Sequence, residues 1–344
     1  MEVCSHGGMD PKTILLKLNG TRCNLACKYC IETPKMLGRR MSLNYIERLF
    51  SDLPEDVSII LHGGEPLLDA AYVEQVLKLF IGLRKGTIGI QTNGVFPQSM
   101  FDVLFRYSSK IRLGISVDGP AECNKSRVSS SGKQMFGIID HTIDTLSEHG
   151  IPIKCIATIA KDNINDPLGF IHYFASKSNL RQLRVNPCFS IPRNGAADVA
   201  ISPLQFLSFL KVVSTEWIQD GLYRQFRLDP TQSFAERILS GRPIPDKKCK
   251  QFVSVYSDGV CTLCDALGRD SFICKDWKTL FDQVGCLYDH GLQATPCGTC
   301  SEVSTCDSGC PASFLAFGTS ISDYCQYRRA FASFVRETIG RDNQ

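Results

Sequence analysis

The sequence predicts an α/β protein: a partial, open (β/α)6 TIM-like barrel followed by a small cysteine-rich domain. Short apolar runs alternate with amphipathic segments over the first two-thirds of the chain. Six such units are too few for a closed eight-unit barrel. From about residue 247 the chain becomes rich in Cys, Gly and Asp, with few long periodic segments. In a parallel sheet of this kind, ligands bind at the carboxyl ends of the strands.

The predicted strands are short apolar runs, and an amphipathic segment follows each of them. The strands are Thr13–Leu18, Val57–Leu61, Thr87–Gln91, Lys110–Val117, Ile153–Ile159 and Gln182–Asn186. The helices are Ser42–Ser51, Asp69–Leu83, Gln98–Tyr107, Gln134–His149, Asp166–Ser178, Ser202–Asp220 and Tyr327–Ile339. Ser42 and Asp69 are expected as N-caps, because their side chains can accept a hydrogen bond from the first helical turn.

Composition divides the chain and limits its partners. We expect the barrel over residues 10–225, a linker over 226–246, the cysteine-rich domain over 247–327 and a terminal helix and tail over 328–344. The net charge is +3, with Lys and Arg scattered, so no nucleic-acid partner is expected. No apolar run approaches a membrane span and none resembles a signal peptide, so we expect a cytoplasmic protein without membrane attachment. In a reducing cytoplasm, the 17 cysteines indicate metal or catalytic sites rather than disulfides.

Three cysteines follow the first predicted strand directly, and their spacing is informative. Cys23, Cys27 and Cys30 form a C-x3-C-x2-C loop. Three thiolates can hold three corners of a [4Fe–4S] cluster and leave the fourth iron open to another ligand. A zinc site is the alternative, although structural zinc takes four protein ligands.

This loop and three later motifs together resemble the signature of the radical S-adenosylmethionine (SAM) enzymes. The later motifs are H-G-G-E-P over residues 62–66, Q-T-N-G over 91–94 and S-V-D-G-P over 116–120. The resemblance implies a [4Fe–4S] cluster that binds SAM through its open iron. It also implies SAM contacts from Tyr29, Gly63, Gly64, Glu65, Asn93, Ser116, Asp118 and Arg127. Glu65 would hold the amino group of SAM, Ser116 and Asp118 would lie near its carboxylate and ribose, and Tyr29 near its adenine.

The C-terminal cysteines resemble the SPASM extension of the same enzymes, which holds two auxiliary [4Fe–4S] clusters. By this resemblance one cluster is bound by Cys249, Cys264 and Cys310, and the other by Cys297, Cys300, Cys306 and Cys325. Either Cys261 is the fourth ligand of the first cluster, or that iron is open to a substrate. Two structural zinc sites are the alternative for the whole set, because C-x2-C pairs also bind zinc. Asp265 is either a catalytic base, as in sulfatase-maturating relatives, or a hydrogen-bonding loop residue.

The two resemblances together imply a peptide maturase. Reductive cleavage of SAM would give a 5′-deoxyadenosyl radical, which abstracts a hydrogen from a ribosomally made precursor peptide and leads to a carbon–carbon or thioether cross-link, such as a cyclophane. An anaerobic sulfatase-maturating enzyme that forms formylglycine is the alternative, as is a small-molecule radical SAM dehydrogenase. A non-enzymatic electron carrier or zinc scaffold would leave the H-G-G-E-P and S-V-D-G-P motifs unexplained. The implied partners are the precursor peptide, an electron donor such as flavodoxin or ferredoxin, and a separate leader-recognition protein.

Overall fold

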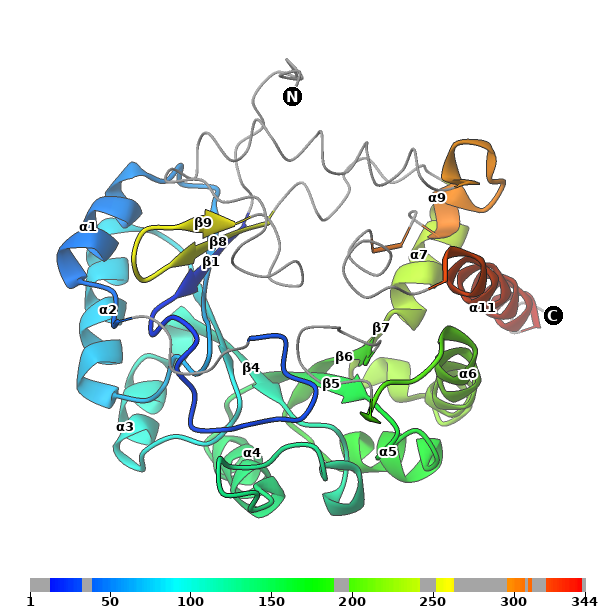
Figure 1. Cartoon of the computed structure of the whole chain (residues 1–344), viewed down its shortest axis with the longest axis horizontal. Helices are drawn as coiled ribbons and strands as arrows, with labels where there is room; N and C mark the ends of the chain where they lie inside the picture. Colours follow the sequence, from blue (N-terminus) through cyan, green and yellow to red (C-terminus); the bar gives the residue numbers. More distant parts are fainter. Residues whose placement is uncertain are drawn as a thin grey trace.

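The computed structural model describes residues 13–32, 39–188, 198–241, 252–262, 296–306, 309–310 and 320–341. Within these residues the centre of the molecule is one nine-stranded sheet, in the order β7-β6-β5-β4-β3-β2-β1-β8-β9. Neighbouring strands are parallel except β8 and β9, which are antiparallel. Figure 1 shows α1 to α6 around the outer side of the curved sheet, which does not close into a complete barrel.

The six predicted strands are confirmed, with ends that differ by at most two residues. They are β1 (Thr13–Lys17), β2 (Ser58–His62), β3 (Ile88–Thr92), β4 (Ile111–Ser116), β5 (Ile153–Ile159) and β6 (Leu180–Pro187). Alternate side chains of these strands are buried on one face of the sheet, as Ile14, Ile59, Ile90 and Ile115 illustrate. The residues between them are mostly less buried, so the strands show the alternation expected when one face of a sheet packs against the core.

The predicted helices are also confirmed, and the two expected N-caps are present. They are α1 (Leu43–Asp52), α2 (Ala70–Leu83), α3 (Ser99–Arg106), α4 (Phe136–Glu148), α5 (Pro167–Ala175) and α6 (Pro203–Gln219). The side chains of Ser42 and Asp69 accept hydrogen bonds from the backbone N–H groups of Tyr45 and Tyr72. Short 3-10 turns are η1 (Ser108–Lys110), η2 (Ala121–Cys123), η4 (Leu222–Arg224) and η7 (Pro296–Thr299).

Three further strands and three further helices complete the described elements. They are β7 (Arg227–Asp229), α7 (Thr231–Ser240), β8 (Phe252–Tyr256), β9 (Cys261–Thr262), α9 (Val303–Cys306) and α11 (Ile321–Arg341). The segment expected as a linker therefore contains β7 and α7. The expected cysteine-rich domain contributes β8 to the main sheet, where it pairs with β1.

The C-terminal helix α11 begins earlier than expected and packs against the barrel. It contacts α6 and α7. The rings of Phe206 and Tyr327 lie 5.6 Å apart, and those of Phe234 and Phe331 lie 5.1 Å apart. The first turns of α11 lie beside the ends of the strands, because Tyr324, Tyr327 and Arg328 line the same cavity as residues at the ends of β2 to β6. Among the described helices, none combines the length and apolar character needed to cross a membrane.

Candidate active site

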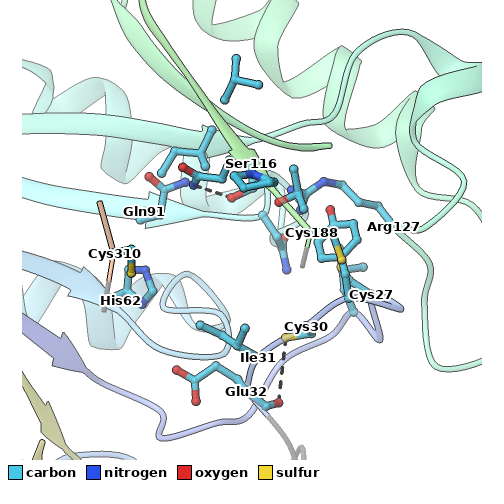
Figure 2. A pocket seen from close by; sticks show the side chains of 18 of the residues that line it. Cys27, Cys30, Ile31, Glu32, His62, Gln91, Ser116, Arg127, Cys188 and Cys310 are labelled. Atoms are coloured by element: carbon cyan, nitrogen blue, oxygen red, sulfur yellow. Dashed lines mark hydrogen bonds between the residues drawn. The ribbon is translucent and has the colours of Figure 1, made fainter. Parts of the chain in front are cut away.

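A cavity of about 570 Å³ opens at the carboxyl ends of the strands, where the fold predicts a ligand site. Cys23, Cys27 and Cys30 line it, together with residues at the ends of β2 to β6 (Figure 2). Cys310 and Arg328 line it from the distant C-terminal part of the chain. The cavity thus joins the three-cysteine loop to a segment of the cysteine-rich region.

The H-G-G-E-P segment holds one side of the cysteine loop. The backbone N–H of Gly64 donates to the carbonyl of Gly20 at 3.0 Å, and that of Glu65 donates to the carbonyl of Arg22 at 2.8 Å. A Cβ atom on Gly64 would lie 2.0 Å from the carbonyl oxygen of Arg22. The two chain segments approach so closely that residue 64 has to be glycine.

Replacing Gly64 by alanine should therefore destabilise the protein by about 3 kcal/mol or more, because backbone atoms must move to relieve the clash. Gly82→Ala is the matched control, since a Cβ there, in helix α2, would meet no atom within 4 Å. It should stabilise the protein by up to about 1 kcal/mol through helix propensity. Anaerobic urea unfolding measures both. Equal stability of the two variants would contradict the close approach.

The segment after S-V-D-G-P holds the other side of the cysteine loop. The backbone N–H of Ala26 donates to the carbonyl of Val128 at 2.7 Å, and that of Lys28 donates to the carbonyl of Ser126 at 3.0 Å. Leu25, between Cys23 and Cys27, is 2% exposed and anchors the loop in the core. Backbone hydrogen bonds to the segments that follow β2 and β4 therefore hold the loop on both sides.

Asn93 orients a predicted cluster ligand. Its side-chain amide donates to the sulfur of Cys23 at 3.4 Å, and the backbone N–H of Leu25 donates to the same sulfur at 3.3 Å. The backbone N–H of Asn93 in turn donates to the carboxylate of Glu65 at 2.7 Å. Two N–H donors directed at one sulfur favour its thiolate form, which is the form that binds metal.

Glu65, the residue expected to hold the amino group of SAM, lies behind the cavity wall. It is fully buried and does not line the cavity, whereas Gly63 and Gly64 do. Its carboxylate accepts hydrogen bonds from the hydroxyl of Thr92 at 2.7 Å and from the backbone N–H groups of Asn93 and Leu67 at 2.7 Å and 2.9 Å. Glu65 therefore ties two strand ends together and positions Asn93.

The burial of Glu65 predicts a pH dependence of stability. Burial raises the pKa of its carboxyl to about 7, although hydrogen bonds from Asn93, Thr92 and Leu67 act in the opposite direction. The folded protein then holds a proton that the unfolded chain has lost, so the free energy of unfolding falls as the pH rises from about 4.5 to about 7. We expect a decrease on the order of 3 kcal/mol, absent in Glu65→Gln. Urea unfolding of both proteins between about pH 5 and about pH 8 measures it, and parallel pH profiles would contradict the assignment.

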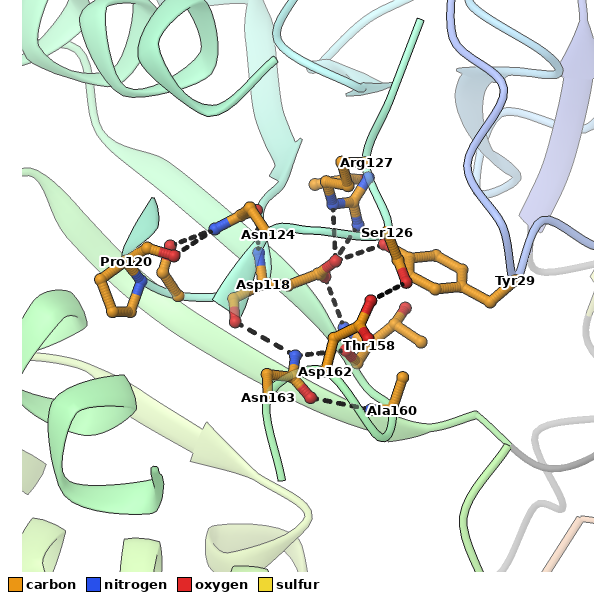
Figure 3. Close-up of polar contacts among 12 residues, drawn as sticks. Tyr29, Asp118, Pro120, Asn124, Ser126, Arg127, Thr158, Ala160, Asp162 and Asn163 are labelled. Atoms are coloured by element: carbon orange, nitrogen blue, oxygen red, sulfur yellow. Dashed lines mark hydrogen bonds and ion pairs between the residues drawn. The ribbon is translucent and has the colours of Figure 1, made fainter. Parts of the chain in front are cut away.

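Asp118 also lies behind the cavity wall, at the centre of a buried polar network (Figure 3). The guanidinium of Arg127 donates from Nη2 to Oδ1 of Asp118 at 3.0 Å and pairs through Nε with Oδ2, also at 3.0 Å. The hydroxyl of Tyr29 donates to Oδ2, and the backbone N–H of Thr158 donates to Oδ1 at 2.8 Å. Tyr29, Arg127 and Ser116 line the cavity, so Asp118 acts on its contents through Tyr29 and Arg127.

The network fixes the charge state of both groups that face the cavity. Burial and the negative charge of Asp118 hold the pKa of Tyr29 well above its usual value, although Arg127 acts in the opposite direction. Burial alone would lower the pKa of Arg127, but the pairing with Asp118 raises it above its usual value. The cavity therefore presents a neutral phenol and a cationic guanidinium.

Asn124 holds the S-V-D-G-P turn closed through both ends of its amide. Its Oδ1 accepts from the backbone N–H of Asp118 at 2.9 Å, and its Nδ2 donates to the carbonyls of Pro120, at 2.9 Å, and Gly119. An ionised aspartate could not donate, so these contacts need the amide.

Sequence reasoning missed Lys17, the charged residue that ends the apolar run of β1. It is fully buried, pairs with Glu32 and lies 3.2 Å from Nδ1 of His62. Glu32 and His62 line the cavity, so both partners of Lys17 border the site. Lys17 could have been found from the sequence, because it interrupts the apolar run that precedes the cysteine loop.

The described C-terminal cysteines do not all line the same cavity. Cys297, Cys300, Cys306 and Cys325 line a second, small cavity, whereas Cys310 lines the main one. Cys261 lines neither: it is 1% exposed, and its Sγ faces the carbonyl oxygen of Gly259 at 3.6 Å. The predicted residues that lie outside the described ranges are Cys249, Cys264 and Asp265.

These residues fit the two cofactors implied by the sequence. Three thiols on one short loop supply three soft ligands on one cavity wall, with no fourth cysteine from the described part of that loop. Beside them, Arg127 carries a buried cation, whose Nε lies 3.0 Å from Oδ2 of Asp118 without the geometry of a hydrogen bond. A cation of this kind suits the carboxylate of an amino-acid-like ligand.

Comparison with known proteins agrees with this geometry. Residues 20–173 match the Radical SAM superfamily. The serine-type anaerobic sulfatase-maturating enzyme of Bacteroides thetaiotaomicron is 24% identical over 88% of this chain and 83% of its own length. The cysteine-type enzyme of Clostridium novyi is 24% identical over 97% of this chain and 96% of its own length.

Two solved structures share the fold. Native anSMEcpe with bound AdoMet superimposes with a TM-score of 0.81 and 20% identity, over 96% of this chain and all of that one. SuiB of Streptococcus suis bound to the precursor peptide SuiA superimposes with a TM-score of 0.67 and 16% identity, over 92% of this chain and 74% of that one. The likeness extends beyond the barrel into the C-terminal region.

Proposed function

We propose that this radical SAM protein oxidises one residue of a peptide or protein substrate, using SAM and three [4Fe–4S] clusters. The cavity carries the proposal, because the three-cysteine loop and the C-terminal Cys310 line it together. In radical SAM domains, reductive cleavage of SAM at the site cluster supplies a 5′-deoxyadenosyl radical that abstracts hydrogen from the substrate. An auxiliary cluster would accept the remaining electron and a base would accept the remaining proton, which would complete a two-electron oxidation of the substrate.

The residues of this chain hold and orient the reactants. Gly63 and Gly64 let the backbone approach SAM closely, and Arg127 offers a cation to its carboxylate. Ser116 and Tyr29 border the same space. Asp118 and Glu65 act from behind by fixing Arg127 and Asn93.

Formylglycine formation in a sulfatase has more support than peptide cross-linking. Curated relatives that match most of the chain are sulfatase-maturating enzymes, whereas the likeness to the SuiB complex supports peptide chemistry more generally. The relatives include both serine-type and cysteine-type enzymes, so either residue is a candidate substrate. By this proposal Asp265 accepts the proton. A flavodoxin or ferredoxin donates the electron to the site cluster, and a separate protein recognises a leader if the substrate has one.

The product distinguishes the two candidates. The reconstituted protein would be incubated anaerobically with SAM, reductant and a sulfatase-derived peptide carrying either serine or cysteine. Formylglycine formation removes two hydrogen atoms from either residue, also exchanges sulfur for oxygen in cysteine, and leaves an aldehyde that a hydrazide captures. A cross-link also removes two hydrogen atoms, but it leaves no aldehyde. Deoxyadenosine without any change in either sulfatase peptide or in a candidate precursor peptide would contradict a peptide or protein substrate.

A further inference from the structure

Helix α11 carries two arginines next to a predicted cluster ligand. Arg328 and Arg329 follow Cys325 by three and four residues. Side chains at these spacings lie on the same helix face, so the helix directs two cations to the side of the Cys325 sulfur. Both arginines line the small cavity that the four cysteines surround.

Each arginine donates to the sulfur of a different cysteine in this set. Nε of Arg328 donates to Sγ of Cys306 at 3.4 Å, and its Nη2 donates to the carbonyl of the same residue. Nη2 of Arg329 donates to Sγ of Cys300 at 3.4 Å. Two of the four cysteines therefore receive a hydrogen bond from a permanently charged group.

Arg328 also connects the two cavities. Its guanidinium lies 4.5 Å from the centre of the Phe234 ring, which packs against it. The same side chain lines the main cavity beside Cys310 and the small cavity beside Cys306. The positive charge of Arg328 therefore lies between the main cavity and the four cysteines. Arg329 is exposed and acts from the solvent side.

Positive charge beside a cluster has a definite effect. A [4Fe–4S] centre with four thiolate ligands becomes more negative on reduction, so N–H donors and cations at its sulfurs stabilise the reduced form. We propose that Arg328 and Arg329 raise the reduction potential of the centre bound by Cys297, Cys300, Cys306 and Cys325, and so make it the better electron acceptor. This inference rests on the proposed function, because it requires an iron–sulfur centre at these cysteines.

Redox titration of the reconstituted protein, followed by electron paramagnetic resonance, tests the proposal. Arg329→Gln should shift the midpoint potential of one centre to a more negative value. Arg329→Lys keeps the positive charge, so its midpoint potential should stay close to that of the wild-type protein. Arg328→Lys should produce a smaller negative shift, because the charge remains and the forked contact to Cys306 is lost. Arg336→Gln is the matched control: Arg336 is an exposed arginine of the same helix that pairs with Glu302 at 2.9 Å. It should leave all the potentials unchanged.

Iron and sulfide analysis separates failure of this inference from failure of the proposed function. Wild-type protein with zinc at these cysteines would overturn both. With full iron content in every variant, an unchanged potential in Arg329→Gln, or an equal shift in Arg336→Gln, would overturn the tuning role alone. Loss of one cluster's iron in Arg329→Gln would also overturn it, because Arg329 would then be needed to retain the centre rather than to adjust it.

Discussion

Replacing Cys27 by alanine should reduce SAM cleavage to the background level. Each thiolate of the loop is expected to hold one iron, and two thiolates cannot retain a cluster that needs three protein ligands. Deoxyadenosine formed under dithionite measures the loss, and iron analysis should show that the auxiliary centres remain. Hydrogen abstraction from any substrate should stop with it, because SAM cleavage supplies the radical that abstracts the hydrogen.

A second cysteine variant controls for general damage. Cys155 lies in β5, is 2% exposed and does not line either described cysteine cavity. Cys155→Ala should therefore retain SAM cleavage at a cost in stability typical of a small buried side chain. Cleavage by Cys27→Ala at the rate of Cys155→Ala would contradict the assignment of the loop.

Replacing Asp118 by alanine should destabilise the protein by about 3–5 kcal/mol, because it leaves the guanidinium of Arg127 buried without its counter-ion. The two side chains are 1% and 6% exposed, so water cannot replace the lost carboxylate without rearrangement. Anaerobic urea unfolding measures the change. Removing Arg127 as well, in Asp118→Ala/Arg127→Met, should restore part of the loss, since the two residues are directly coupled.

An ion pair with an exposed carboxylate provides the comparison for Asp118. Lys177 pairs with Asp144, whose side chain is 54% exposed. Asp144→Asn should cost less than about 1 kcal/mol, because water and salt already screen this pair. Similar losses in Asp118→Ala and Asp144→Asn would show that the Asp118 network is not the buried support described above.

The barrel could be predicted from the sequence because buried apolar residues recur at alternate positions of its strands and a helix follows each strand. The strands β7 and β8 were missed for different physical reasons. In β7 (Arg227–Asp229), two of the three residues are charged and pair with each other, so this short strand has no apolar run that the sequence would reveal. In β8, the run Phe252–Tyr256 lies within the cysteine-rich region, and its place beside β1 depends on pairing with a strand more than two hundred residues away.

The motifs predicted which residues gather at the site but not which of them face the cavity. Glu65 and Gly64 are adjacent, yet Gly64 borders the cavity and Glu65 points away to bind Asn93 and Thr92. Successive side chains of an extended segment point to opposite sides, so a motif match gives the segment and not the direction. Lys17 was missed because its partners, Glu32 and His62, come from two other segments.

The most direct test of the account is the electron paramagnetic resonance spectrum of the reduced, oxygen-free protein with and without SAM. Binding of SAM to an iron that lacks a protein ligand should change the signal of one centre and leave the auxiliary signals as they were. The change should be absent in Cys27→Ala. A wild-type spectrum that is identical with and without SAM would contradict the claim that the three-cysteine loop presents an open iron to this ligand.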